Sequence, residues 1–264
     1  ITNSGTLTFN GATDYTFGQQ ISGAGDLVKA NANNTLTLSA TNTYTGDTTI
    51  SAGTLKLTGN LNSATDLVID TGATLDLQAA LTAATLTLNG TISNTAGTSS
   101  LTISSTSNLG GNVTTTGTQT YQGAVTLSAA TVTLTTTDSN ITFNGTIDSD
   151  GVSARALTLN LNGAEAVSIT ADVIFGNDTA DTLGASNPLG AISITGDLDL
   201  NAAITSAASL AVSGTSNLGA NVTTSGTQTY TGAVTLSAAT VTLTTSDSNI
   251  TFNGTIDSDG VSAR

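Results

Sequence analysis

Short segments in which Thr, Ser or another polar residue alternates with Leu, Ile, Val or Phe recur along the whole chain. They lie at residues 6–9, 35–38, 54–57, 74–77, 85–88, 125–127, 132–134, 141–143 and 192–194. Successive side chains of a β-strand point to opposite faces, so each segment has one buried and one solvent-facing side. Gly, Asn, Asp and Ser separate the segments, as is typical between short strands. The pattern therefore predicts many short strands with an aliphatic inner face.

Composition and turn residues define the kind of sheet. Strong helix formers are scarce, because Lys and Arg together number 4 and Met is absent, whereas β-branched residues favour strands. Asn-Gly pairs recur at 10–11, 89–90, 144–145 and 253–254. Asn and Gly tolerate positive φ, which suits a sharp change of direction, although the same pair also favours an antiparallel meander of hairpins. Because one short apolar pair repeats along the chain, we favour an all-β, right-handed parallel β-helix, or β-solenoid.

A long internal repeat supports one continuous solenoid over residues 1–264. Residues 106–155 recur at 215–264, an offset of 215 − 106 = 109 residues, and 46 of the 50 positions are identical. With about 20 residues per coil and about 4.8 Å between coils, we expect roughly 13 coils and a rod of about 60 Å. Residues 176–190 break the pattern and contain Pro188, so this segment is predicted to be an irregular loop.

Charge and residue usage exclude several classes of function. The net charge is −14 and His and Cys are both absent. A nucleic-acid site needs clustered cations, and catalysis by Ser–His–Asp or Cys–His systems and common zinc sites need His or Cys. No run of 18 apolar residues exists, so we expect no membrane insertion of this segment. We expect no cofactor and no enzymatic activity.

The acidic pairs of the repeat are the candidate metal ligands. They are Asp148 and Asp150 and their copies Asp257 and Asp259. Asp-x-Asp-Gly resembles the start of a calcium loop, because Ca²⁺ prefers carboxylate oxygens. The rest of such a loop is missing, and a solvated corner is the favoured interpretation, ahead of calcium binding and of carboxylate catalysis on a polysaccharide. Solvent-facing Thr-x-Thr pairs similarly allow ordered water binding, but Lys56 and Asp76 interrupt them.

Residues 21–57 carry a family resemblance. The segment 35–57, TLTLSATNTYTGDTTISAGTLKL, resembles the passenger-associated transport repeat, also called the autotransporter-associated β-strand repeat. Asn34, Ala40 and Asp47 stand where that family usually has Gly. Residues 106–155 and 215–264 are more loosely similar to repeats of filamentous-haemagglutinin-type exoproteins. The resemblance implies a secreted β-helical passenger at the bacterial cell surface and assigns no site residues.

Two functions follow as hypotheses. The first is a structural or adhesive repeat region of a large secreted bacterial surface protein, either an adhesin stalk or a biofilm component, whose partner is a host or neighbouring-cell surface. The alternative is a self-assembling extracellular filament or sheath subunit, which associates along the solenoid axis. Since no polar cap is evident near Arg264, we expect the chain to be a fragment of a longer repetitive protein.

Overall fold

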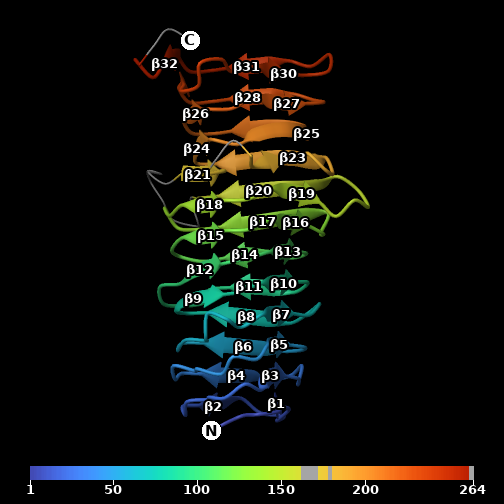
Figure 1. Cartoon of the computed structure of the whole chain (residues 1–264), viewed down its shortest axis with the longest axis vertical. Helices are drawn as coiled ribbons and strands as arrows, with labels where there is room; N and C mark the ends of the chain where they lie inside the picture. The colour runs from blue at the N-terminus through green and yellow to red at the C-terminus, as the bar shows by residue number, and fades with distance from the viewer. Residues whose placement is uncertain (162–171, 178–179, 262–264) are drawn as a thin grey trace.

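Parallel strands stack into a rod. The computed structural model describes residues 1–161, 172–177 and 180–261. All regular secondary structure in those residues is β-strand, and the chain winds from one end of the rod to the other in successive coils (Figure 1). Each strand pairs in parallel with strands of the adjacent coils, as in the pairing of Leu36 with Leu55. The predicted all-β parallel solenoid is confirmed, and the antiparallel alternative is wrong.

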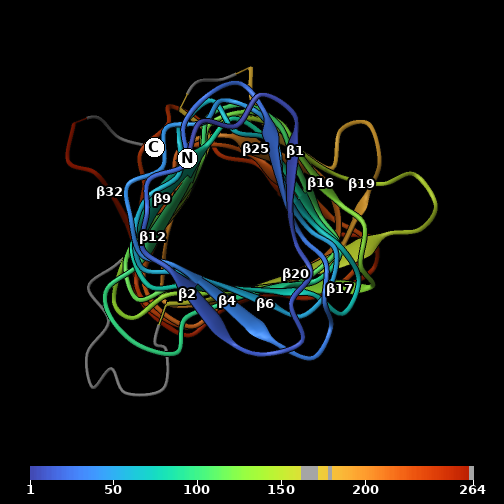
Figure 2. The same ribbon diagram turned by 90° about the horizontal axis from the view of Figure 1, so that it is seen from below.

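Three faces surround a common core, and the view along the axis shows them as the sides of a triangle (Figure 2). Face 1 contains β1 (Thr6–Phe9), β3 (Asp26–Lys29), β5 (Thr48–Ile50), β7 (Leu67–Ile69), β10 (Leu86–Leu88), β13 (Ser107–Leu109), β16 (Val125–Leu127), β19 (Ile147–Ser149), β22 (Thr182–Leu183), the start of β25 (Ala203–Val212), β27 (Val222–Thr224) and β30 (Leu243–Thr244). Face 2 contains β2 (Tyr15–Phe17), β4 (Thr35–Leu38), β6 (Thr54–Leu57), β8 (Thr74–Leu77), β11 (Thr91–Ser93), β14 (Val113–Thr114), β17 (Thr131–Thr135), β20 (Arg155–Asn160), β23 (Leu189–Thr195), the end of β25, β28 (Gln228–Tyr230) and β31 (Ile250–Phe252). Face 3 contains β9 (Ala80–Ala83), β12 (Ser100–Ile103), β15 (Gln119–Tyr121), β18 (Ile141–Phe143), β21 (Asp172–Phe175), β24 (Asp197–Leu200), β26 (Ser216–Leu218), β29 (Val234–Leu236) and β32 (Ile256–Ser258).

The coil length is close to the value expected from the sequence. Paired residues on face 1 are 48 − 27 = 21 residues apart between β3 and β5 and 125 − 107 = 18 apart between β13 and β16. Ile147 and Leu183, however, pair across 183 − 147 = 36 residues. The rod therefore has about 12 turns, not 13, because one coil takes up many more residues than the others.

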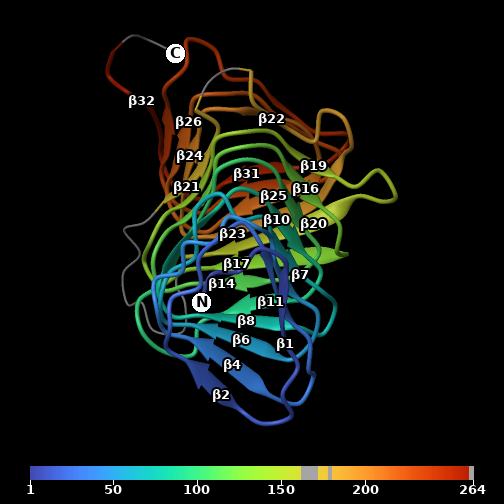
Figure 3. The ribbon, with the colours of Figure 1, turned by 60° about the horizontal axis from the view of Figure 1, so that its bottom comes forward.

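The segment 176–190, which the sequence predicts as a loop, contains the strand β22 and the start of β23. Leu183 in β22 pairs with Ile147 and Ile204 and so continues face 1. Its residues 178 and 179 lie outside the described part, as do residues 262–264 of the second repeat copy. The oblique view shows β22 next to β19 (Figure 3).

Alternate side chains fill the interior. Leu134 is 0% exposed, whereas Thr133 beside it is partly exposed. Leu157, Leu159 and Leu161 are also buried, as the alternation predicts. Aromatic rings of successive coils stack in the core, with ring centroids 5.1 Å apart between Tyr121 and Phe143. One apolar cluster runs through the rod.

Three of the four Asn-Gly corners need glycine for a different reason from the predicted one. The glycines of these pairs (Gly11, Gly90, Gly145 and Gly254) are not among the described residues with positive φ. A Cβ on Gly145 would instead lie 2.7 Å from the carbonyl carbon of Gly123 in the preceding coil, and one on Gly90 would lie 2.2 Å from the carbonyl oxygen of Ala73. At Gly90, Gly145 and Gly254 the side chain is excluded by close stacking of coils, not by the turn conformation.

Three tyrosines are buried, and burial changes their ionisation. Tyr44, Tyr121 and Tyr230 are each 0% exposed. The Tyr44 hydroxyl and Thr48 Oγ1 are 2.6 Å apart, and burial raises the pKa of Tyr44 to about 12. Burial raises the pKa of Tyr121 and of Tyr230 as well. Each folded pKa exceeds the unfolded value of about 10, so the neutral hydroxyls stabilise the fold fully below that pH.

The facing of β17 can be tested with a matched pair of variants. Leu134→Asp places an unpaired carboxylate between stacked coils and should lower the free energy of unfolding by several kcal/mol. Thr133→Asp changes the neighbouring outward position and should cost less than about 1 kcal/mol. Denaturant unfolding followed by circular dichroism measures both. Equal losses would show that the inward and outward assignments are wrong.

Alkaline pH should unfold the rod through its tyrosines. Stability falls as the pH rises from about 10 through 12, because the unfolded chain loses the tyrosine protons first. In a base titration, tyrosinate absorbance from the three buried rings should appear together with loss of the strand signal. Tyr44→Phe should move that transition to higher pH. Ionisation of all four tyrosines before any unfolding would contradict their burial.

Candidate binding face

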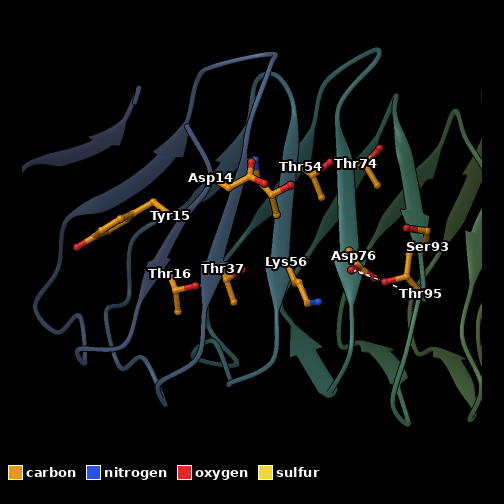
Figure 4. A pocket seen from close by; sticks show the side chains of 11 residues that line it. Asp14, Tyr15, Thr16, Thr37, Thr54, Lys56, Thr74, Asp76, Ser93 and Thr95 are labelled. Atoms are coloured by element: carbon orange, nitrogen blue, oxygen red, sulfur yellow. Dashed lines mark hydrogen bonds between the residues drawn. The ribbon is translucent and has the colours of Figure 1, made fainter. Parts of the chain in front are cut away.

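The outer surface of face 2 is hollowed near the N-terminal end. Strands β2, β4, β6, β8 and β11 line a shallow concavity of about 570 Å³ (Figure 4). Parallel register aligns outward side chains into two rows along the rod axis. The first row is Thr35, Thr54, Thr74 and Thr91, and the second is Thr16, Thr37, Lys56, Asp76 and Ser93. The face therefore presents ordered hydroxyl groups, which both donate and accept hydrogen bonds.

Lys56 is the accessible cation of this face. Its ammonium group forms no hydrogen bond or ion pair within the described part of the chain, and Figure 4 shows it projecting from the threonine surface. The other lysine and arginine side chains are buried, paired with a carboxylate or outside the described residues. Lys29 is buried, Arg155 pairs with Asp150, and Arg264 lies beyond residue 261. Lys56 thus adds one charged donor to the hydroxyl rows.

Asp76 joins two coils and leaves little of its charge exposed. Its Oδ1 accepts a hydrogen bond from the Thr95 backbone N–H at 3.0 Å, and its Oδ2 accepts from Thr95 Oγ1 at 2.7 Å. Gln78 Nε2 donates to the same Oδ2 at 2.8 Å. Asp76 is 5% exposed. The sequence correctly indicates that Lys56 and Asp76 interrupt the threonine rows, and the structure shows that Asp76 acts as an acceptor between coils.

The carboxylates of the first candidate calcium pair accept hydrogen bonds from other groups of the protein. Asp148 lies outward on β19, and its Oδ1 accepts the backbone N–H groups of Ser186 and Asn187 at 3.0 and 3.1 Å. Arg155 donates to Asp150 through Nε at 3.0 Å and Nη2 at 2.6 Å. Those hydrogen bonds hold the pKa of Asp150 at about 2. Asp150 therefore fastens the loop after β19, which projects from the rod in Figure 2. Asp148 fastens the segment between β22 and β23 instead.

The second pair is placed differently. Asp257 and Asp259 are exposed at the last described coil, and Asp257 lies on face 3 whereas Asp148 lies on face 1. The structure does not bring the two pairs together. Within the described residues no three acidic, His or Cys side chains gather in a way that could hold a metal ion.

Sequence reasoning missed a column of acidic residues beside face 1. Asp26, Asp47 and Asp66 precede in-register positions of β3, β5 and β7. Burial and the neighbouring charges of Asp66 and Asp26 raise the pKa of Asp47. The Asp26 carboxylate accepts the Asp47 backbone N–H at 3.0 Å. The sequence spacing of these aspartates could have revealed the column, because residues about 20 positions apart lie next to each other in adjacent coils.

Lys29 is a further residue to which sequence reasoning assigned no role. It occupies an inward position of β3 and is 0% exposed. Its Nζ donates to the carbonyl oxygen of Ala52 at 3.0 Å and to that of Asn31. Burial lowers the pKa of Lys29, and the nearby Asp14 carboxylate opposes that shift. The amine therefore satisfies carbonyl groups at the corner between faces 1 and 2.

Residues 27–57 match the family model of the passenger-associated-transport-repeat. The chain carries a passenger-associated transport repeat. The repeat comprises most of β3 and all of β4, β5 and β6, and includes Lys29, Tyr44 and Gly53. Gly53 has φ +72°, and a Cβ there would lie 2.8 Å from Lys29 Nζ, so glycine at this corner leaves room for the ammonium group of Lys29. No curated protein and no solved structure matched the chain in the same comparisons.

Identical sequence around Asp148 and Asp257 allows a matched test of the acidic pairs. Asp148→Ala removes an acceptor for two backbone N–H groups and should lower stability by about 1–2 kcal/mol. Asp257→Ala, at the exposed counterpart, should change stability by less than about 0.5 kcal/mol. Thermal melts in calcium and in EDTA should agree within a few degrees for both variants and the parent chain. A fall of tens of degrees in EDTA would instead establish these aspartates as calcium ligands.

Proposed function

We propose that this chain is a stalk region of a large secreted bacterial surface protein that acts in adhesion or biofilm formation. The passenger-associated transport repeat within a parallel β-solenoid carries this proposal, since both fit an autotransporter passenger region. The protein would be exported and would act outside the cell. Its partner would be a host or neighbouring-cell surface, and its role would be mechanical rather than catalytic.

The physical properties of the rod suit that role. About 12 turns at about 4.8 Å per turn give a length of about 58 Å. Each coil contacts only its neighbours, so added coils extend the rod without altering the core. The outward side chains are mostly hydroxyl and amide groups, and a net charge of −14 keeps such rods apart in solution. No helix among the described residues is long and apolar enough to cross a membrane.

End-to-end assembly is the second candidate function. It rests on the stacking of coils, since a second chain can add its strands to a rod by the same pairing that joins adjacent coils. Such assembly would give a filament or sheath rather than a stalk.

Cells that display the protein can test the stalk proposal. An in-frame deletion of residues 1–264 should reduce cell attachment and biofilm mass, with surface display confirmed by antibody labelling of a terminal tag. Unchanged attachment at equal display would refute an adhesive role. Sedimentation of the purified chain over a hundredfold concentration range separates the alternative: a constant monomer supports the stalk, whereas particles that grow with concentration support the filament.

A further inference from the structure

The two near-identical segments occupy different faces of the rod. Ser107 begins β13 on face 1, and from there the pairing passes through Val125, Ile147, Leu183 and Ile204, which is four turns. Ser216, at 107 + 109 = 216, is the counterpart of Ser107. It pairs with Leu198 on face 3, two faces beyond Ile204. One 109-residue unit thus spans four turns and two of the three faces.

The first strands of the segment meet similar neighbours in both places. Ser107 lies between Leu86 and Val125, and Ser216 lies between Leu198 and Val234. The same holds for the buried glutamines. Gln119 lies between Leu101 and Ile141, and Gln228 lies between Leu210 and Ile250. The residue below is therefore a Leu of the preceding coil in every case, whereas the β-branched residue above belongs to the copy itself, although the faces differ.

The polar network inside the segment is also rebuilt on the new face. Tyr121 donates to Gln119 Oε1 at 3.2 Å, and Gln119 Nε2 donates to the Thr135 carbonyl at 2.9 Å. In the second copy, Tyr230 donates to Gln228 Oε1 at 3.2 Å, and Gln228 Nε2 donates to the Thr244 carbonyl at 2.8 Å. The segment carries its buried hydrogen bonds with it.

We propose that the rod tolerates loss or gain of one 109-residue unit, and that each event turns all coils beyond the junction by two thirds of a turn. The axial change is about 22 Å for four and two-thirds turns. An outward row then faces another side of the rod, as the row of Thr126 on face 1 already recurs as the row of Thr235 on face 3. This inference goes beyond the stalk function: the repeat changes both the length of the rod and the direction in which its surfaces point.

Deletion of residues 106–214 makes the proposal testable. The variant joins Ser105 to Thr215, and the following residues differ from 106–155 at 50 − 46 = 4 positions. The second copy should then seat on β12 as the first copy does. In the full chain Thr229 pairs with Ala211 on face 2. In the deletion variant Thr229 should take the place of Thr120 and pair with Thr102 on face 3.

Engineered disulfides report these neighbours without background, because the chain contains no cysteine. Cα atoms of in-register parallel neighbours are about 4.8 Å apart, within the range of about 4.4–6.8 Å for a disulfide. Under oxidised glutathione, Ala211→Cys/Thr229→Cys should cross-link in the full chain, and Thr102→Cys/Thr229→Cys should not. The latter pair should cross-link in the deletion variant, at least tenfold more than in the full chain. Thr102→Cys/Thr120→Cys in the full chain is the positive control.

Two results would overturn the proposal. Cross-linking of Asp199→Cys/Thr229→Cys in place of Ala211→Cys/Thr229→Cys in the full chain would place both copies on the same faces and remove the rotation. An unfolded or aggregated deletion variant, judged by circular dichroism and size-exclusion chromatography, would show that the unit cannot be lost. Neither result depends on whether the protein is adhesive.

Discussion

Backbone hydrogen bonding between coils in parallel register determines most of this structure. Each coil lies on the preceding one with matched positions, as in the column of Leu36, Leu55 and Leu75 on face 2. Because the register is kept from coil to coil, residues of one type at matching positions form a continuous row along the axis. The threonine rows, the Tyr121–Phe143–Phe175 ring stack and the column of Asp26, Asp47 and Asp66 all arise in this way. It also lets like charges accumulate: burial raises the pKa of Asp47, and the neighbouring charges of Asp66 and Asp26 raise it further.

Features that depend on local alternation were predictable from the sequence. The inward position of Leu134 and the outward position of Thr133 follow from a period of two, and so does the parallel solenoid once the pattern repeats along the chain. Features that depend on distances between coils were not. The number of turns was overestimated because the coil between Ile147 and Leu183 is longer than the others. The role of Gly145 was misread because its constraint comes from the backbone of Gly123 in another coil.

The contacts of polar side chains were likewise predictable where the partners are close in sequence and not where they lie in another coil. Alternation places Lys29 at an inward position, but its charge argues for solvent, and only the structure reveals the corner carbonyls that accept its hydrogen bonds. Asp150 and Arg155 are close in sequence, so their ion pair lay within reach of sequence reasoning. The donors to Asp148 are 38 and 39 residues away along the chain. No local pattern could identify them.

The two copies of the repeat distinguish the interactions that form within the segment from those that depend on neighbouring residues outside it. Tyr121 and Gln119 keep their hydrogen bonds in the second copy because every partner lies inside the repeated segment. Asp148 and Asp257 do not share an environment, because the donors to Asp148 belong to residues outside the segment. The same buried hydrogen bonds therefore form on either face. The hydrogen-bond partners of an outward side chain depend instead on the coil that follows it. A surface site on such a rod has to be argued coil by coil, even where the sequence repeats.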